Sequence, residues 1–367
     1  MDFSLSEDQQ AIADLATQIL DDKASHEIQR DLEKRKGLRF DRELWSALAD
    51  AGLLGIAVPD AQSGAGLGFL ELAAILEQMG RHTAPVPFYE TALLAGLPLA
   101  RFGTEGQRAK WLPKLAAGEV IATAALLEQT ATAARRDGDG FVLTGVKLCV
   151  PAGELADLVL VPASLDGSPE IFLLDPKAPG VTLEPIETTS GMPESRLALD
   201  GARVDADALL GGAGRGAEAL AWTELHATAG LCLLTLGCCE AALEITSEYI
   251  KTRKQFDQPI SMFQAVGHRA ADAYIDTEAI RLTTWQAAWR LSEGLPSDKQ
   301  VAVAKFWCAE GAKRVVHAAL HLHGGVGVDR EYPLHRFFLH ARHLELALGG
   351  ATEQLVKLGA QLAAEVA

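Results

Sequence analysis

The sequence is poor in cysteine and in positive charge. Its 367 residues include five cysteines, none of them in a CxxC pair, so we expect no zinc site and no other metal centre. Lys and Arg number 33 against 49 Asp and Glu, which gives a net charge of −16 without a basic run. This balance argues against nucleic acid and against an anionic membrane surface as partners. A small anionic ligand stays compatible with it, because local fields can oppose the net charge.

The sequence also lacks the marks of export. Its opening, MDFSLSEDQQ, is acidic and polar, with neither the positive n-region nor the apolar h-region of a signal peptide. No apolar run reaches the roughly 18 residues that are needed to span a bilayer. We therefore expect a cytoplasmic protein with buried, reduced thiols. The cysteines in question are Cys149, Cys232, Cys238, Cys239 and Cys308.

What is present predicts an α+β protein of three segments. Residues 1–118 carry apolar residues at helical spacing, and Ser6 followed by acidic residues is typical of a helix start. Residues 119–208 hold short β-branched runs separated by Gly, Pro and Asp, which predict a small β domain, either a barrel or a sandwich. Residues 209–367 contain three long helical patterns with mostly short connections, as in an antiparallel bundle.

One stretch between two of these helices combines cations with an aromatic residue. It reads TRKQFDQPISMFQAV, from Thr252 to Val266. Arg253 and Lys254 end a long helix, where cations stabilise the macrodipole, and this is the simplest interpretation. The functional alternative is that Arg253 binds a phosphate while Phe256 offers a flat apolar face.

A second stretch is rich in glycine. It reads HLHGGVGVDREYPLHRF, from His321 to Phe337. Glycines at 324, 325 and 327 let the backbone approach a ligand closely, and free N–H groups there can bind a pyrophosphate. A dinucleotide-binding fingerprint would need a strand before it, whereas a helix precedes this one. A plain turn between two helices is the structural alternative.

In this order the two stretches resemble motifs of the acyl-CoA dehydrogenase family. The family's first motif is Arg-x-x-Phe-Gly-x-x-Ile followed by Phe-Gln-Ala, and the sequence has Arg253-Lys-Gln-Phe256-Asp-Gln-Pro-Ile260 followed by Phe263-Gln264-Ala265. The second is Gln-x-x-Gly-Gly-x-Gly-x-x-x-Glu-x-Pro. The sequence matches it from His321 through Gly324, Gly325 and Gly327 to Glu331 and Pro333. The stretch GTEGQRAKWLPKLAAGE and the opening FSLSEDQQAI fit as well, so the resemblance covers nearly the whole chain.

The resemblance implies a fold, a cofactor and a set of site residues. The fold would be an N-terminal helical domain (1–118), a central β domain (119–208) and a C-terminal four-helix bundle (209–367). Family members are usually homotetramers that hold FAD between subunits and oxidise acyl-CoA. By the resemblance, Arg253, Gln255 and Phe256 would lie near the adenosine diphosphate of one FAD, with Gln264 as a further contact. His321, Gly324 and Gly325 would touch the pyrophosphate of an FAD bound mainly by a neighbouring subunit.

The family's catalytic carboxylate has no match at its expected positions. In the family a Glu before Gly-Thr near the C-terminus removes the substrate α-proton. That position falls on Leu348 or Gly349, depending on the alignment, and neither takes a proton. Glu353 lies about one helical turn later, and Glu345 precedes the position.

Some family members carry the base on the first long C-terminal helix instead. That position, 26 residues before the matched arginine, falls on Ala227, and its neighbour is Thr228. Glu224 lies three residues before Ala227 and projects from a similar helix face, so it is the best candidate base in the chain. His226 points elsewhere on the helix, which favours a structural role.

The β segment departs from the family as well. The family's Glu-Pro-x-x-Gly-Ser-Asp and Lys-x-Trp-Ile-Thr-Asn elements bind flavin and the substrate carbonyl. Here Glu128 remains without the Gly-Ser-Asp turn, and Lys147 is followed by Cys149, Val150 and Pro151 in place of Trp-Ile-Thr. Thr130 or Thr132 are partial substitutes. The resemblance then implies a weak or absent flavin site on this chain's own face.

Three hypotheses follow. In the first, the chain resembles the non-catalytic subunit of actinobacterial α2β2 acyl-CoA dehydrogenases for steroid side-chain CoA thioesters, and contributes to the FAD site of a catalytic paralogue. In the second, it is a self-sufficient homo-oligomeric acyl-CoA dehydrogenase with Glu224 or Glu353 as its base. In the third, it is a non-enzymatic binding or scaffold protein. The helical patterns are intact, which argues against a decayed gene.

Overall fold

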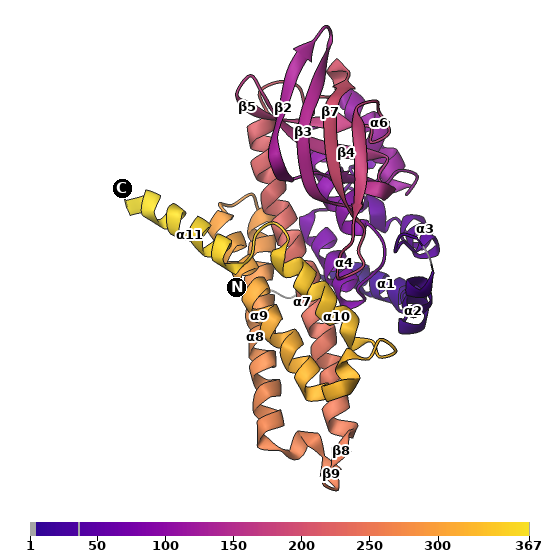
Figure 1. Cartoon of the computed structure of the whole chain (residues 1–367), viewed down its shortest axis with the longest axis vertical. Coiled ribbons are helices and arrows are strands. Elements are labelled where there is room, and N and C mark those ends of the chain that lie inside the picture. Colours follow the sequence, from indigo (N-terminus) through magenta and orange to yellow (C-terminus); the bar gives the residue numbers. More distant parts are fainter. Residues whose placement is uncertain (1–4, 36, 367) are drawn as a thin grey trace. The chain divides into compact units, whose positions relative to one another are not determined.

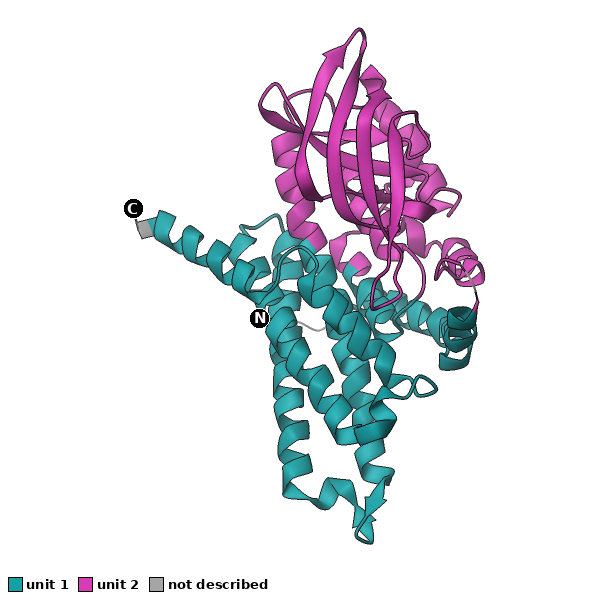
Figure 2. Ribbon diagram, viewed as in Figure 1, with its two compact units in different colours: residues 1–34, 73–84, 228–367 teal, residues 35–72, 85–227 magenta. Residues whose placement is uncertain are grey.

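The computed structural model describes residues 5–35 and 37–366. These residues form two compact units that interleave along the chain (Figure 2). Unit 1 comprises the described residues of 1–34, 73–84 and 228–367, and unit 2 comprises those of 35–72 and 85–227. The first helices of the chain therefore belong to the same unit as the last ones.

Unit 1 is helical, apart from one short hairpin (Figure 1). Its first helix begins where the sequence predicts, because the Ser6 hydroxyl accepts the Gln9 N–H and the Gln9 side chain accepts the Ser6 N–H. Two helices, α4 and α7, begin in unit 2 and continue into unit 1. The helices are α1 (Glu7–Lys23), α2 (His26–Lys34), α4 (Phe69–Arg81), α7 (Gly216–Thr252), α8 (Gln264–Ser292), α9 (Asp298–His323), α10 (Leu334–Leu346) and α11 (Ala351–Val366). The hairpin is β8 (Lys254–Gln255) and β9 (Gln258–Pro259), followed by a 3₁₀ turn, Ile260–Met262.

The three long helices that the sequence predicts are confirmed as α7, α8 and α9, which run side by side in Figure 1. Small residues of α7, such as Cys238 and Ala242, pack with Val316 of α9 and Phe337 of α10 in one buried cluster. The expectation that no stretch could span a membrane needs correction, because α7 is long and apolar enough by length and composition. Of its most apolar window, 83% is buried within the protein, as in the core helix of a globular fold.

A buried ionic cluster joins α4 to α7 and α8 in unit 1. Glu240 is buried and pairs with Arg81, at 2.8 Å, and with Arg281. Glu77 accepts the Trp285 indole N–H at 2.9 Å. Burial, followed by the charge of Glu240, raises the pKa of Glu77 to about 7. The carboxyl of Glu77 is therefore mostly protonated between about pH 4.5 and about pH 7, where an ordinary glutamate is ionised.

Because the pKa of Glu77 is raised, the stability of the protein decreases as pH rises. Folded Glu77 holds its proton more tightly than the unfolded chain does, so the stability that it contributes is lost as pH rises from about 4.5 to about 7. In Glu77→Gln the amide oxygen still accepts from Trp285 and never ionises. We expect the variant to be more stable than the wild type by on the order of 2 kcal/mol at about pH 8, and equal to it near pH 4.5. Urea unfolding at both pH values measures this, with the exposed Glu248→Gln as control.

Unit 2 holds the β sheet and a few short helices. The sheet is a single seven-stranded sheet with the order β1-β4-β2-β3-β7-β6, and β5 pairs with β4. Its strands bury Leu143, Val161, Phe172 and Leu199 in one core cluster. The strands are β1 (Ala122–Ala124), β2 (Leu127–Asp137), β3 (Gly140–Pro151), β4 (Leu158–Leu165), β5 (Ser168–Leu174), β6 (Val181–Ile186) and β7 (Glu194–Val204). The helices of this unit are α3 (Arg42–Asp50), α5 (Leu97–Phe102), α6 (Glu105–Ala116) and a π-helix, Tyr89–Gly96.

Candidate functional site

The hairpin after α7 presents an aromatic ring to solvent. Phe256 and Asp257 form its two-residue turn, and both have a left-handed backbone, with φ of 51° and 61°. Asp tolerates this conformation, but it is uncommon for a bulky residue such as Phe. Phe256 is 87% exposed and meets the edge of Phe263 at 6.1 Å between ring centroids. An exposed ring on a strained turn contributes little to the stability of the chain itself.

The polar residues of this hairpin are exposed too. The Arg253 backbone closes the loop, because its N–H donates to Tyr249 and its carbonyl accepts from Ile260, each at 2.8 Å. Its guanidinium pairs with no carboxylate in the described parts of the chain. The side chains of Gln255, in the hairpin, and of Gln264, at the start of α8, are exposed as well. The arrangement leaves the Arg253 cation and the Gln264 amide exposed to an external ligand, while the Gln255 amide N–H donates to the Lys254 carbonyl at 2.8 Å.

The glycine-rich turn, Gly324–Val328, follows α9 directly. At Gly324 the backbone has φ 62° and ψ −138°, a region that essentially only glycine occupies. A side chain added at Gly324 or Gly325 would meet no atom within 4 Å, whereas one at Gly327 would lie 3.1 Å from the Cβ of His323. The first two glycines thus face open space, and the third is needed for packing. His321, in the last turn of α9, is exposed.

The structure brings the hairpin and the glycine-rich turn to the same end of the bundle (Figure 1). Tyr249, in the last turn of α7, stacks on His323 with 4.1 Å between ring centroids. Its hydroxyl donates to the His323 carbonyl at 3.3 Å, and the Tyr332 hydroxyl lies 3.2 Å from Nε2 of His323. Sequence reasoning missed these three residues. The one available signal was an aromatic residue four positions before Arg253.

The segment at the family's usual base position carries no carboxylate. Leu348 and Gly349 follow α10 with left-handed backbones, at φ 54° and 98°. Their carbonyls each accept the Gln354 amide at 3.2 Å. Lys305, 0% exposed, donates to the Leu344 carbonyl at 2.6 Å and so caps the end of α10. Burial lowers the pKa of this amine. The segment is held by hydrogen bonds from the Lys305 and Gln354 side chains to its main-chain carbonyls, and these bonds do not depend on the side chain at 348.

The nearby glutamates are engaged in local structure. Glu353 accepts the Gly350 N–H at 2.5 Å in the first turn of α11, as a helix cap does. Glu345 pairs with Arg342 within α10. Glu224 lies exposed on the part of α7 that belongs to unit 2. None of the three is a buried carboxylate of the kind that burial turns into a general base near neutral pH.

His226 is a core residue in the part of α7 near Glu224. Its ring stacks on Trp222 at 3.7 Å and meets the edge of Phe69 at 4.9 Å. One ring nitrogen, Nδ1, lies 2.8 Å from the Trp222 carbonyl. Burial lowers the pKa of His226 to about 4, so the ring is neutral at physiological pH. These contacts agree with a structural role.

The β sheet carries a buried lysine where the resemblance expects flavin contacts. Lys147 of β3 is fully buried, and its amine lies 2.5 Å from Glu128 on the paired strand β2. Burial lowers the pKa of Lys147, and Glu128 opposes that shift. The Thr132 hydroxyl is buried without a hydrogen-bond partner among the described residues, while Thr130 is exposed. The charge of Lys147 is thus already paired with that of Glu128 within the chain.

One sequence expectation fails at the end of β3. All five cysteines are free, but Cys149 is exposed, and only the other four are buried. The left-handed backbone at Cys149, φ 48°, breaks the inward–outward alternation of the strand. The register between β3 and β7 shifts between Lys147 and Val150 at this point. The irregularity turns a residue outward that a regular strand could bury.

Comparison with known proteins gives a consistent assignment over nearly the whole chain. Three family descriptions match in order: Acyl-CoA dehydrogenase N-terminal domain over residues 6–119, middle domain over 116–200 and C-terminal domain over 214–362. Acyl-CoA dehydrogenase FadE27 of Mycobacterium tuberculosis is 42% identical over 374 residues, which cover 99% of each protein.

Solved structures of the same architecture include heteromeric assemblies. A chain of the ChsE4-ChsE5 complex from Mycobacterium tuberculosis is 43% identical, with a TM-score of 0.95 over 99% of both chains. A chain of the Tcur3481-Tcur3483 steroid ACAD is 42% identical, with a TM-score of 0.92 over 99% of both chains. The more distant glutaryl-CoA dehydrogenase of Mycobacterium smegmatis was solved in complex with FADH2; it is 25% identical, with a TM-score of 0.89 over 98% of this chain and 95% of its own.

Proposed function

This chain belongs to the acyl-CoA dehydrogenase family of FAD-dependent oxidoreductases, and we propose that it is the subunit without a catalytic carboxylate in a heteromeric member of that family. The observation that carries the proposal is the segment after α10, where Leu348 and Gly349 stand at the usual base position. The likeness to chains of the ChsE4-ChsE5 complex and of a steroid ACAD supports it. The substrate class would be a bulky acyl-CoA thioester such as a steroid side-chain CoA, oxidised between its α and β carbons in the cytoplasm.

The end of the bundle that faces solvent suits the adenosine diphosphate half of FAD. Arg253 supplies an unpaired cation for a phosphate, and Phe256 supplies a flat face for an adenine. Gly324 and Gly325 expose backbone next to open space. The Gly324 N–H already donates to the carbonyls of His321 and Leu320, so the proposed N–H donor to a pyrophosphate is that of Gly325. The other proposed contacts are exposed at the same end: Gln255, Gln264 and His321. When bound, FAD supplies the acceptor for the substrate hydride.

The sheet of unit 2 suits the flavin ring less well. The Lys147 amine is paired with Glu128, and the family's Trp-Ile-Thr segment is replaced by Cys149, Val150 and Pro151. We therefore propose that this chain holds part of an FAD whose ring lies on a partner chain. The partner would be a catalytic paralogue of the same fold, and neither nucleic acid nor a membrane is needed.

Exposed apolar side chains support an assembly with another chain. On α8, Tyr274 and Ile275 are 57% and 62% exposed. On α11, Leu355, Val356 and Leu362 are exposed in the same way. Rows of large apolar residues on a single chain mark surfaces that a partner covers. Only the 3₁₀ turn Ile260–Met262 and Phe263 separate α8 from the hairpin proposed to face FAD, so a partner on this helix would also approach the cofactor.

Flavin content tests the proposal directly. We expect the chain expressed alone to be nearly free of flavin. Co-expressed with a catalytic-type paralogue from the same source, it should give a yellow complex with about one FAD per pair of chains that bleaches when acyl-CoA is added without oxygen. A lone chain that is yellow and bleaches with substrate would overturn the proposal, and would indicate that one of its own carboxylates is the base.

The same complex tests whether this chain holds a base. We expect the double variant Glu224→Gln, Glu353→Gln to retain turnover within about twofold of the wild type, because both carboxylates are exposed and Glu353 is engaged by the Gly350 N–H. Steady-state kinetics of the complex measure this. Loss of a base would lower kcat by about 10² or more, and such a loss would instead support a self-sufficient enzyme. Glu365→Gln, a surface substitution on the same helix as Glu353, serves as control.

A further inference from the structure

A pocket opens in unit 2, between the N-terminal half of α6, the start of β4 and the ends of β5 and β7. Its volume is about 490 Å³, within the roughly 300–1,000 Å³ of small-molecule sites in proteins. All of its lining residues belong to unit 2, so it shares none with the hairpin and the glycine-rich turn, which belong to unit 1 (Figure 2). The pocket therefore has no residue in common with the contacts proposed for FAD.

Apolar and aromatic side chains form part of the pocket lining. Leu158, at the start of β4, and Leu173, near the end of β5, are buried beneath it. Trp111 of α6 is half-buried and contributes an indole ring. It lies four residues after Gln107, which also lines the pocket, so the two share one face of the helix. This lining can remove the apolar part of a ligand from water.

Gln107, which is buried, holds the pocket in shape. Its amide nitrogen donates to the carbonyls of Asp207 and Leu209, at 2.7 and 2.9 Å. Its amide oxygen accepts the N–H groups of Thr104 and Gly211, at 2.9 and 3.1 Å. These four bonds fix the 3₁₀ turn Ala206–Ala208 against α6 without using the Asp207 carboxylate. A pocket that is fixed in this way loses little conformational entropy when it binds a ligand.

Acidic side chains outnumber basic ones around the pocket. The lining acids are Asp157, Asp175, Asp205 and Asp207, and the lining bases are Lys110 and Arg203. Lys177 engages the first two acids, through its amine and its backbone N–H, and Asp137 pairs with the guanidinium at 3.0 Å. The carboxylates of Asp205 and Asp207 are exposed, and neither has an ion pair or a hydrogen bond among the described residues. Unpaired negative charge therefore faces the pocket.

One cation of the chain itself already lies on the aromatic part of the lining. The ammonium of Lys110 is 5.1 Å from the centroid of the Trp111 ring, within the range of a cation–π contact. Lys110 is exposed and pairs with no carboxylate in the part of the chain that the structure describes. An external cation can displace it, because an exposed ammonium on a flexible stem gains little from its contact. The indole face thus attracts positive charge and stays accessible to it.

We propose that this pocket binds a small organic cation with an apolar body, such as an alkyl or aralkyl ammonium. The apolar body packs on Leu158 and Leu173, and the ammonium faces the Trp111 ring and the carboxylates of Asp205 and Asp207. The net charge of −16 adds long-range attraction for such a ligand. A metal ion fits less well, because no group of three or more His, Cys, Asp or Glu among the described residues is arranged to hold one. The inference does not depend on FAD or on a partner chain.

Three probes of similar shape and different charge test the proposal: phenethylammonium, the neutral phenethyl alcohol and the anion hydrocinnamate. Calorimetric titration of the purified full chain at neutral pH and low salt is the measurement. We expect the cation to bind with a Kd of about 1 mM or below, the alcohol at least about fivefold more weakly and the anion more weakly still. Added salt should weaken binding of the cation. Equal affinity for cation and alcohol, or no binding of the cation, would overturn the proposal.

Substitutions at the rim locate the site and give changes of opposite sign. Lys110→Gln removes the competing ammonium and should strengthen binding of phenethylammonium about threefold, whereas Lys114→Gln, an exposed lysine of the same helix outside the pocket, should leave it unchanged. The double variant Asp205→Asn, Asp207→Asn should weaken binding about fivefold or more. Asp139→Asn, at an exposed turn outside the pocket, is its control. All these residues are exposed, so the variants should fold. Weaker binding in Lys110→Gln would mean that the pocket does not select cations and would overturn the proposal.

Discussion

A Gly325→Val variant is expected to fold as the wild type does and yet to lower the FAD affinity of the complex by about tenfold or more. Gly325 has an ordinary backbone conformation, outside the left-handed region, and a side chain there meets no atom within 4 Å. The fold therefore has no reason to require glycine at this position. A ligand that approaches the backbone does have one, because a branched side chain would stand between the N–H groups and a pyrophosphate.

Substitutions at two neighbouring positions, Val328 and Gly324, serve as comparisons for Gly325→Val. Val328→Ala alters the same turn but removes an exposed side chain instead of adding one, so we expect it to leave FAD affinity unchanged. Gly324→Ala should lower both stability and affinity, because φ 62° with ψ −138° strains any residue with a side chain. Equilibrium dialysis of FAD and thermal unfolding of each complex give the two quantities. Full FAD affinity in Gly325→Val would contradict the assignment of this turn to the cofactor.

The helical part of the fold was open to prediction because its signals are local. Ser6 followed by acidic residues marks the start of α1, and the long periodic stretches give α7, α8 and α9. Among the strands, β3, β4, β5 and β6 correspond to short β-branched runs. These features need only a few consecutive residues, so no knowledge of the rest of the chain is required.

Two long strands were not recognised, and the reason is physical. β2, with the sequence LEQTATAARRD, has few β-branched apolar residues, and its first five residues are exposed. It is a strand because β3 pairs with it, through a register that shifts at Thr130. β7 buries Leu197 and Leu199 but continues through Gly201, where φ is 67°. Strand formation here depends on neighbours that lie elsewhere in the sequence, which local propensity does not report.

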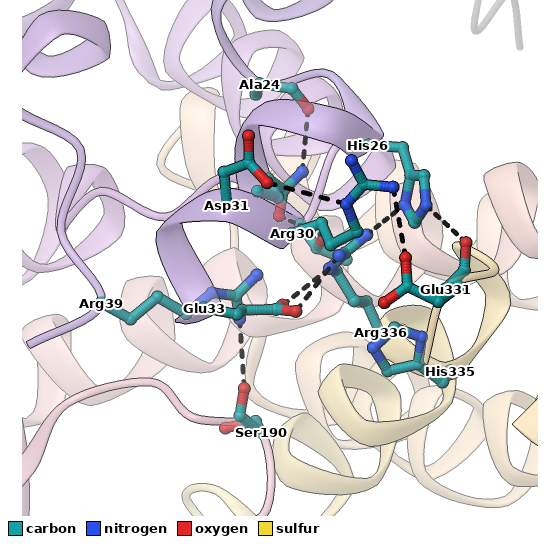
Figure 3. A network of polar contacts seen from close by, with 12 residues as sticks. Ala24, His26, Arg30, Asp31, Glu33, Arg39, Ser190, Glu331, His335 and Arg336 are labelled. Atoms are coloured by element: carbon teal, nitrogen blue, oxygen red, sulfur yellow. Dashed lines mark hydrogen bonds and ion pairs between the residues drawn. The ribbon is translucent and has the colours of Figure 1, made fainter. Parts of the chain in front are cut away.

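In the candidate site, too, local motifs could be predicted from the sequence and contacts between distant residues could not. Motif spacing selects Arg253, Phe256 and the glycines, and the structure then adds their exposure and their common location. The sequence treats all three glycines alike, whereas only Gly327 packs against its own chain. The partners of the loop that follows the turn lie far away in the sequence: His26, which contacts the Glu331 carbonyl, is 305 residues from it (Figure 3). No pattern within a window of sequence could have indicated them.

The largest effect on stability is expected from glycines at the crossing of α4 and α7. A Cβ placed on Gly237 would lie 1.9 Å from the carbonyl oxygen of Glu77 and 2.7 Å from the backbone nitrogen of Arg81. One placed on Gly80 would lie 2.1 Å from the carbonyl oxygen of Leu234. The two helix backbones are therefore in direct contact, and all three atoms that would clash are main-chain atoms. A flexible side chain could move aside, but here a whole helix would have to shift.

Gly237→Ala is accordingly expected to destabilise the protein by about 3 kcal/mol or more. The shift would also displace Glu77 and Arg81, which belong to the buried ionic cluster with Glu240, so a packing defect would become an electrostatic one. Gly359→Ala is the matched control: the same substitution, also within a helix, but with no atom within 4 Å of the new Cβ. There alanine should stabilise by up to about 1 kcal/mol, because glycine is the poorer helix former. Urea unfolding of the two variants should therefore give changes of opposite sign, and a loss of similar size in both would mean that helix propensity, not the contact of two backbones, governs this crossing.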